Sequence, residues 1–286
     1  MILFFFGSLS IRAQEVPAGP QAPPPEHRVT RMSAPGEAEA PPALPPDEII
    51  KRVSAKEDEY VQARAVYTFR RTVRIQEFGP DGNPDGEYVL ITQQSRTPEG
   101  EIFDKVVQRP QSTLHRMHLV TEDVEALDRF PAYPLITSQL SQYNLKYVGK
   151  EKIDEIDCYI FQVKPRLIQR AHPLFDGVIW IDDKYLEVVK TYGRWVTDLG
   201  GISTPALPFT LFETYREYVD GKFWFPTYAR SDETMHLDKS EFPIRVTIRW
   251  SDFKRVDGSS KAQAPASPSS APTDTPSAAP AVKPSP

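Results

Sequence analysis

Apolar and polar residues alternate along most of the chain after Ala65, which predicts a protein built mainly of β-strands. The first alternating run places Tyr67, Phe69 and Val73 on one face, and threonine and arginine side chains fill most of the other face. The last run, at 244–250, is the most regular and ends on the apolar side chain of Trp250. Two faces of opposite character on one strand are typical of a sheet that is covered on one side.

Turn signals separate these runs and suggest how the strands connect. The stretch "GPDGNPDG" at 79–86 reverses the chain after the first run, and Asp220-Gly221 is the strongest short hairpin signal. Counting the runs gives about nine to eleven strands, and they do not alternate with helices as a parallel sheet requires. We therefore expect a mainly β protein of the α+β class, with one large curved antiparallel sheet.

Two segments have a helical period instead. Residues 46–64 begin with a proline and two acidic residues, which favour the first turn of a helix. The apolar residues of this segment fall near one stripe: Ile49, Ile50, Val53, Tyr60 and Val61. Residues 121–143 interrupt the strand pattern and predict a short helical insertion.

Composition divides the chain further. Of its 286 residues 29 are proline, and most of these lie in residues 14–45 and 258–286, which we expect to be a disordered linker and a disordered tail. The folded domain is then 46–257. The apolar run within residues 1–13 is too short to span a bilayer and resembles a signal peptide, although the usual basic residues before it are missing. We expect an exported protein that is soluble in the periplasm after cleavage.

Candidate chemistry is sparse. Asp182 and Asp183 lie between two apolar runs, where a hairpin turn explains them better than a metal site, because few other ligands are nearby in sequence. His115 and His118 form a weak metal motif without partners. Cys158 lies within a strand pattern and reads as a buried apolar residue. The net charge of −5 does not favour nucleic-acid binding. We therefore expect neither catalysis nor a cofactor nor a metal.

One charge does break the pattern. Arg71 falls on the apolar face of the first strand, where a buried guanidinium needs a charged or hydrogen-bonding partner. The alternative is that Arg71 lies at the rim of a barrel.

The order of these elements resembles the LolA/LolB/RseB superfamily, and more narrowly exported bacterial proteins of the outer membrane lipoprotein-sorting type. The runs that carry the resemblance are "YVGKEKIDEIDCYIFQVKP" at 147–165 and "GVIWIDD" at 177–183. The resemblance implies a half-open barrel with helices as a lid over a hydrophobic cavity. It also implies a carrier that holds lipoprotein acyl chains or another amphiphile, and a membrane-associated donor or acceptor protein as partner. The alternative that it offers is an RseB-like envelope-stress sensor that binds a membrane protein.

Aromatic and branched residues from separate strands would line such a cavity. The expected lining consists of Tyr67, Phe69, Val73, Phe161, Trp180 and Trp250. Arg109, which precedes Pro110, resembles in position the family arginine that contacts the lid.

Overall fold

A computed structural model describes residues 42–97, 100–170, 172–198, 209–237 and 240–256. All of them belong to one compact unit that begins at Pro41. The expected signal peptide, the tail and most of the linker lie outside the described residues, so the boundaries expected there stay predictions.

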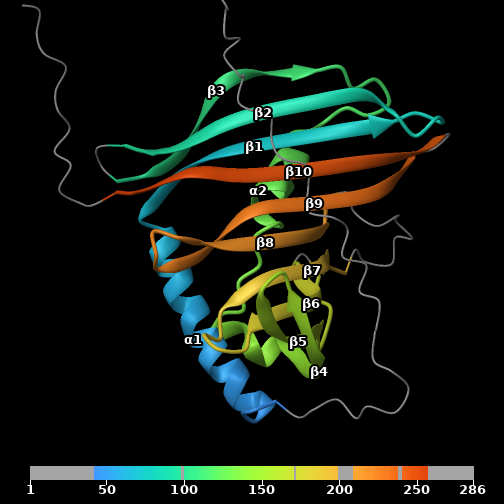
Figure 1. The fold of residues 1–286 in the computed structure, drawn as a ribbon. Coiled ribbons are helices and arrows are strands. Elements are labelled where there is room, and N and C mark those ends of the chain that lie inside the picture. Colours follow the sequence, from blue (N-terminus) through green and yellow to red (C-terminus); the bar gives the residue numbers. More distant parts are fainter. Residues whose placement is uncertain (1–41, 98–99, 171, 199–208, 238–239, 257–286) are drawn as a thin grey trace, which may run out of the picture. The chain divides into compact units, whose positions relative to one another are not determined.

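The described part of the chain forms one ten-stranded antiparallel sheet (Figure 1). Its strands are β1 (Tyr67–Phe78), β2 (Pro84–Arg96), β3 (Ile102–Ser112), β4 (Tyr143–Ile153), β5 (Ile156–Pro165), β6 (Leu174–Asp182), β7 (Val188–Val196), β8 (Leu211–Val219), β9 (Phe223–Leu237) and β10 (Ser240–Arg255). They lie in the order β3-β2-β1-β10-β9-β8-β7-β6-β5-β4, so that β3 and β4 form the two edges and do not pair with each other. The expected fold class, a large unclosed antiparallel sheet, is confirmed.

Helix α1 (Pro46–Arg64) has the predicted bounds, with proline in the first turn and Asp47 and Glu48 behind it. Its apolar stripe is buried apart from Val61, which is 41% exposed and was wrongly included. Val61 is exposed because it borders a cleft described below. The insertion contains helix α2 (Thr121–Arg129) and a six-residue 3-10 helix, η1 (Thr137–Gln142).

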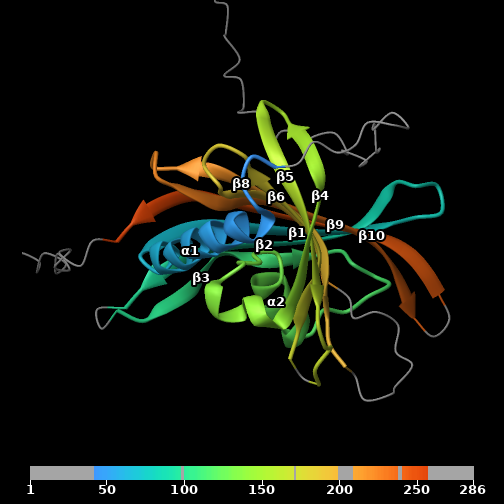
Figure 2. The ribbon, with the colours of Figure 1, turned by 90° about the horizontal axis from the view of Figure 1, so that it is seen from below.

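The helices cover one face of the sheet. The register places Val73, Ile248, Ala229 and Thr214 in one row across β1, β10, β9 and β8. Phe130 and two residues of α2 pack against the apolar members of this row, and the Thr214 hydroxyl donates to the Pro131 carbonyl at 2.6 Å. Figure 2 shows α1 and α2 on the same side of the long strands.

Two predicted turns are confirmed. Asp220 and Gly221 have φ of 53° and 62°, as the two central residues of a type I′ turn require, and the Lys222 amide donates to the Val219 carbonyl at 3.1 Å. After β6, the Asp182 carboxylate accepts hydrogen bonds from the amides of Lys184 (2.7 Å) and Tyr185 (3.1 Å). The aspartate pair therefore begins a turn, because the first carboxylate is occupied by backbone donors.

Candidate functional site

The six residues expected to line a cavity are all buried, but they do not lie together. Phe69, Val73 and Trp250 share the apolar cluster under α2, whereas Tyr67 packs with Phe225 below the C-terminal end of α1. Phe161 belongs to the cluster under the N-terminal half of α1.

Trp180 lies in a fourth cluster with Cys158, on the other face of β6 from Ile179. Its ring is 4.8 Å from the Lys190 ammonium, and its indole N–H donates to Glu151 at 2.7 Å. That the six residues line a cavity stays a prediction. The lid contact expected of Arg109 also stays a prediction: the backbone of Arg109 belongs to β3, and its side chain lies outside the described part of the chain.

Aromatic rings from the insertion fill the space between the helices and the sheet. Tyr133 stacks on Phe175 with ring centroids 4.1 Å apart, and Phe130 stacks on Trp195 at 5.3 Å. The Trp195 indole also donates to the Phe130 carbonyl at 2.7 Å. In this arrangement the insertion packs against the strands β6 and β7.

Close packing under Phe175 depends on two facing glycines, Gly177 in β6 and Gly193 in β7. A Cβ atom added to Gly193 would lie 2.5 Å from the Phe175 ring and 2.6 Å from the Asp176 carbonyl oxygen. Only glycine therefore lets the ring lie flat against these strands.

A buried ion pair joins α1, β8 and the insertion. The Arg216 guanidinium donates to both carboxylate oxygens of Glu57, at 2.7 and 3.0 Å, and to the Tyr133 carbonyl at 2.7 Å. Glu57 also accepts from the Leu135 amide at 3.2 Å. The two charged side chains are 2% and 1% exposed, so this bidentate pair fixes three elements against one another in a region without water.

The partner that Arg71 requires is also present. Its guanidinium donates to Asp104 in β3 at 3.0 Å and to Asp128 in α2. Burial raises the pKa of Asp104, and the charge of Arg71 opposes this rise. Arg71 therefore ties α2 to the sheet, as Glu57 and Arg216 tie α1.

Two clefts flank α1. The first, which we call the aromatic cleft, has a volume of about 490 Å³ and lies between α1, the β6–β7 turn and the β8–β9 turn. The second, the edge cleft, has a volume of about 250 Å³ and lies between α1, the β2–β3 edge of the sheet and Ala132 and Pro134 of the insertion. Tyr60 lines both clefts and is 5% exposed.

The edge cleft has an apolar mouth. Val61 of α1 and Ile102 of β3 line it and are 41% and 46% exposed. Its polar members include Arg64, whose guanidinium donates to the Tyr60 hydroxyl at 3.1 Å. Sequence patterns do not reveal such a site, because its lining comes from α1, the β2–β3 edge and the insertion, which are far apart in the sequence.

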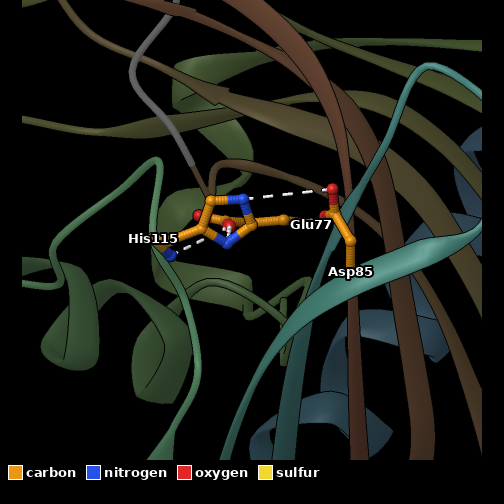
Figure 3. A group of neighbouring side chains, drawn as sticks. All are labelled: Glu77, Asp85 and His115. Atoms are coloured by element: carbon orange, nitrogen blue, oxygen red, sulfur yellow. Dashed lines mark hydrogen bonds and ion pairs between the residues drawn. The ribbon is translucent and has the colours of Figure 1, made fainter.

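A group of acidic and histidine side chains lies at the opposite end of β1 from α1, where Glu77, Asp85 and His115 approach one another (Figure 3). The Glu77 carboxylate is fully buried and accepts from the amides of His115, Arg116 and Met117, and the Arg116 guanidinium donates to Asp85 at 2.9 Å. Since backbone donors and a guanidinium already occupy these oxygens, we interpret the group as the anchor of the loop that leads to α2, and not as a metal site.

No protein-family model matches the chain, and no curated protein matches it in sequence. Solved structures similar to it include a DUF1329 family protein from Desulfovibrio piger, with 16% identity over 72% of this chain and 94% of that chain and a TM-score of 0.30. A LolA superfamily protein from Nitrosomonas europaea has 15% identity over 73% of this chain and 94% of that chain, with a TM-score of 0.32.

The Pseudomonas aeruginosa MucA/MucB complex contains a chain with 10% identity over 71% of this chain and 99% of that chain, with a TM-score of 0.24. The Nitrosomonas europaea protein carries the superfamily name that the sequence resemblance gives. No helix among the described residues is long and apolar enough to cross a membrane.

Proposed function

We propose that this protein is a non-catalytic periplasmic carrier that holds the apolar part of an amphiphile, such as a lipoprotein acyl chain, beside helix α1. The observation that carries the proposal is the pair of clefts that flank the helix and share Tyr60. An apolar chain that enters the edge cleft meets Val61 and Ile102 first, and each buried CH₂ group contributes about 0.8 kcal/mol.

The attachment of α1 supports entry at its C-terminal half. The N-terminal half packs through Ile49, Ile50 and Val53 into a continuous apolar cluster. The C-terminal half, after Glu57, is bordered by a cleft on each side and contacts the sheet mainly through Tyr60 and Ala63. Displacing Tyr60 would join the two clefts without unpacking the N-terminal half of the helix.

A fluorescent fatty-acyl probe tests this proposal. Val61→Asp and Ile102→Asp each put a charge at the mouth of the edge cleft, on side chains that are already exposed, so folding should be little affected. Losing the contact of about two methylene groups should weaken probe binding about tenfold in each variant. The matched control is Leu167→Asp, since Leu167 is 70% exposed and lines neither cleft.

Extraction of lipids from protein purified from the cell envelope gives an independent reading. The proposal fails if the parent protein binds no acyl probe and no acyl species co-purifies with it. It also fails if the control weakens binding as much as the two mouth variants do, because binding would then not depend on the edge cleft.

One observation favours a second function, an RseB-like sensor that binds a membrane-protein partner. The edge strand β3 exposes Ile102, Phe103, Val106 and Val107, each between 44% and 49% exposed. An exposed apolar edge can add a strand from another chain. Val107→Lys should then abolish capture of the partner, whereas acyl-probe binding should stay unchanged. A chain that captures no membrane protein from solubilised envelopes, in parent or variant form, does not have this function.

A further inference from the structure

The aromatic cleft differs from the edge cleft in its lining. Four of its residues are charged and five are aromatic. They are Lys56, Glu59, Tyr60, Tyr185, Glu187, Tyr218, Lys222, Phe223 and Trp224. Figure 1 shows the turns that follow β6 and β8 beside α1. Lys56, Glu59 and Tyr60 come from one face of α1, because positions three and four residues apart lie together on a helix.

Two of the four charges neutralise each other. The Lys56 ammonium donates to Glu187 at 2.8 Å and joins α1 to the β6–β7 turn. Burial raises the pKa of Glu187, and the Lys56 charge lowers it. This pair forms part of the wall of the cleft and offers a ligand no net charge.

The other two charges are open to a ligand. Within the described part of the chain, neither Glu59 nor Lys222 has an ion-pair partner, and both side chains are exposed at the rim. They belong to different elements, α1 and the β8–β9 turn. The cleft therefore presents one anion and one cation that lack ion-pair partners among the described residues, and the Lys222 ammonium lies 5.1 Å from the Phe223 ring of the same cleft.

The rings favour a cationic group on the ligand. Cations of the protein already lie near three of the five rings: Lys184 is 4.9 Å from the Tyr185 ring, Arg216 is 4.5 Å from the Tyr60 ring and Lys222 is 5.1 Å from the Phe223 ring. The surface left for a ligand is the pair Tyr218 and Trp224, whose rings lie 5.8 Å apart in a tilted arrangement, with Tyr218 56% exposed. Electron-rich ring faces attract ammonium groups, and aromatic cages are a common way to bind quaternary ammonium. Glu59 adds a formal negative charge to that attraction.

We infer that the aromatic cleft binds a zwitterionic head group, in which an ammonium lies a few atoms from a phosphate or carboxylate. The ammonium meets the rings and Glu59, and the acidic group meets Lys222. A purely anionic ligand would leave Glu59 facing a like charge, and a purely cationic ligand would do the same to Lys222. This inference rests on the proposed function, since it names the head group of the amphiphile whose tail enters the edge cleft past Tyr60.

Three detergents with one tail and different heads test it: dodecylphosphocholine, dodecyl sulfate and dodecyltrimethylammonium, each below its micelle concentration. We expect dodecylphosphocholine to bind about tenfold more tightly than dodecyl sulfate, which lacks the cation–π contact and the charge pair with Glu59. It should bind about two- to fivefold more tightly than dodecyltrimethylammonium, which lacks only the charge pair with Lys222. Equal affinities for the three would overturn the inference. Binding of the acyl probe with no preference among heads would overturn it and leave the proposed function standing, whereas no binding of any tailed probe refutes both.

Two variants that each remove one charge give a pattern that a purely structural role would not. Glu59→Gln should weaken the zwitterionic and cationic detergents about two- to fivefold and leave dodecyl sulfate unaffected or stronger. Lys222→Gln should weaken the zwitterionic and anionic detergents and spare the cationic one. Glu122→Gln and Lys254→Gln, exposed positions that line neither cleft, are the controls. Equal effects of either cleft variant on all three detergents would overturn the assignment of charges.

Phosphocholine without a tail separates the two sources of a zwitterion. If the ligand is an amphiphile, phosphocholine should displace dodecylphosphocholine only at a concentration at least about a hundredfold higher, because it lacks the apolar contact. If phosphocholine displaces dodecylphosphocholine at an equal concentration, the ligand is not an amphiphile, and the cleft binds a small soluble zwitterion instead.

Discussion

Replacing Arg216 with methionine should destabilise the folded unit more than most single substitutions. Methionine keeps much of the side-chain volume but removes all three hydrogen bonds that the guanidinium donates to Glu57 and Tyr133. Glu57, 1% exposed, would keep only the Leu135 amide as a partner. Removing one member of a buried ion pair costs about 3–5 kcal/mol, because the remaining charge is left in a region without water.

Urea denaturation followed by tryptophan fluorescence measures this cost. For a unit of this size the same loss lowers the thermal midpoint by roughly 6–20 °C. Arg52→Met is a matched control, since Arg52 forms an exposed i,i+4 pair with Glu48 at 2.7 Å. That pair should contribute no more than about 0.5 kcal/mol.

A double variant distinguishes charge from packing. Glu57→Leu combined with Arg216→Met removes both charges and should recover most of the lost stability, as happens when apolar residues replace a buried pair. If Arg216→Met alone costs less than about 1 kcal/mol, a range typical of exposed pairs, the pair is solvated and α1 is not held by it. If the double variant is as unstable as the single one, the cost comes from lost packing and the electrostatic reasoning is wrong.

Three further outcomes follow from the packing and the turns. Gly193→Ala should cost at least about 1–3 kcal/mol in urea denaturation, because its Cβ would lie 2.5 Å from the Phe175 ring; an unchanged midpoint would mean that the ring does not lie over this strand. Asp182→Asn should change stability by less than about 1 kcal/mol, because an amide oxygen can also accept from the Lys184 amide, and a larger loss would show that the charge matters. Burial raises the pKa of the Cys158 thiol to about 12, so it should resist alkylation at pH 8 until urea unfolds the chain. Because the folded state holds the thiol proton more tightly than the unfolded state, the contribution of Cys158 to the free energy of unfolding should fall as pH rises from about 8.5, the unfolded pKa, toward the folded pKa. Rapid alkylation of the native protein at pH 8 would contradict both the burial and this pH dependence.

Local patterns predicted the local structure well. The bounds of α1, the turn at Asp220-Gly221 and the role of Asp182 depend on a few consecutive residues, and these were confirmed. Arg71 was correctly expected to need a partner, because a charge on an apolar face is visible from alternation alone. Which carboxylate it would find was not visible, since Asp128 is 57 residues away in the sequence.

The candidate site was harder to predict for two physical reasons. In β6 both faces are apolar, so alternation could not tell which of Ile179 and Trp180 faces the helices, and Trp180 lies on the other side. In the sequence, Glu57 and Arg216 each occupy a position that is typical of an exposed polar residue. Their pairing could not be predicted, because they are 159 residues apart. A cleft between elements depends on such long-range contacts, which no window of sequence contains.

The position of α1, and with it the existence of both clefts, depends on charge as well as on apolar area. The apolar cluster under Ile49, Ile50 and Val53 holds one half of the helix, but it does not determine how close the other half lies to the sheet. The bidentate Arg216–Glu57 pair sets this distance, because its hydrogen bonds tolerate little change in distance or angle. A buried pair adds little net stability compared with apolar residues of the same shape. Its more specific effect is to keep Tyr60 between two spaces of unlike chemistry, one apolar at its mouth and one charged and aromatic. An amphiphile has the same division along its length, which is why the geometry of α1, more than the composition of the core, connects this fold to the function proposed for it.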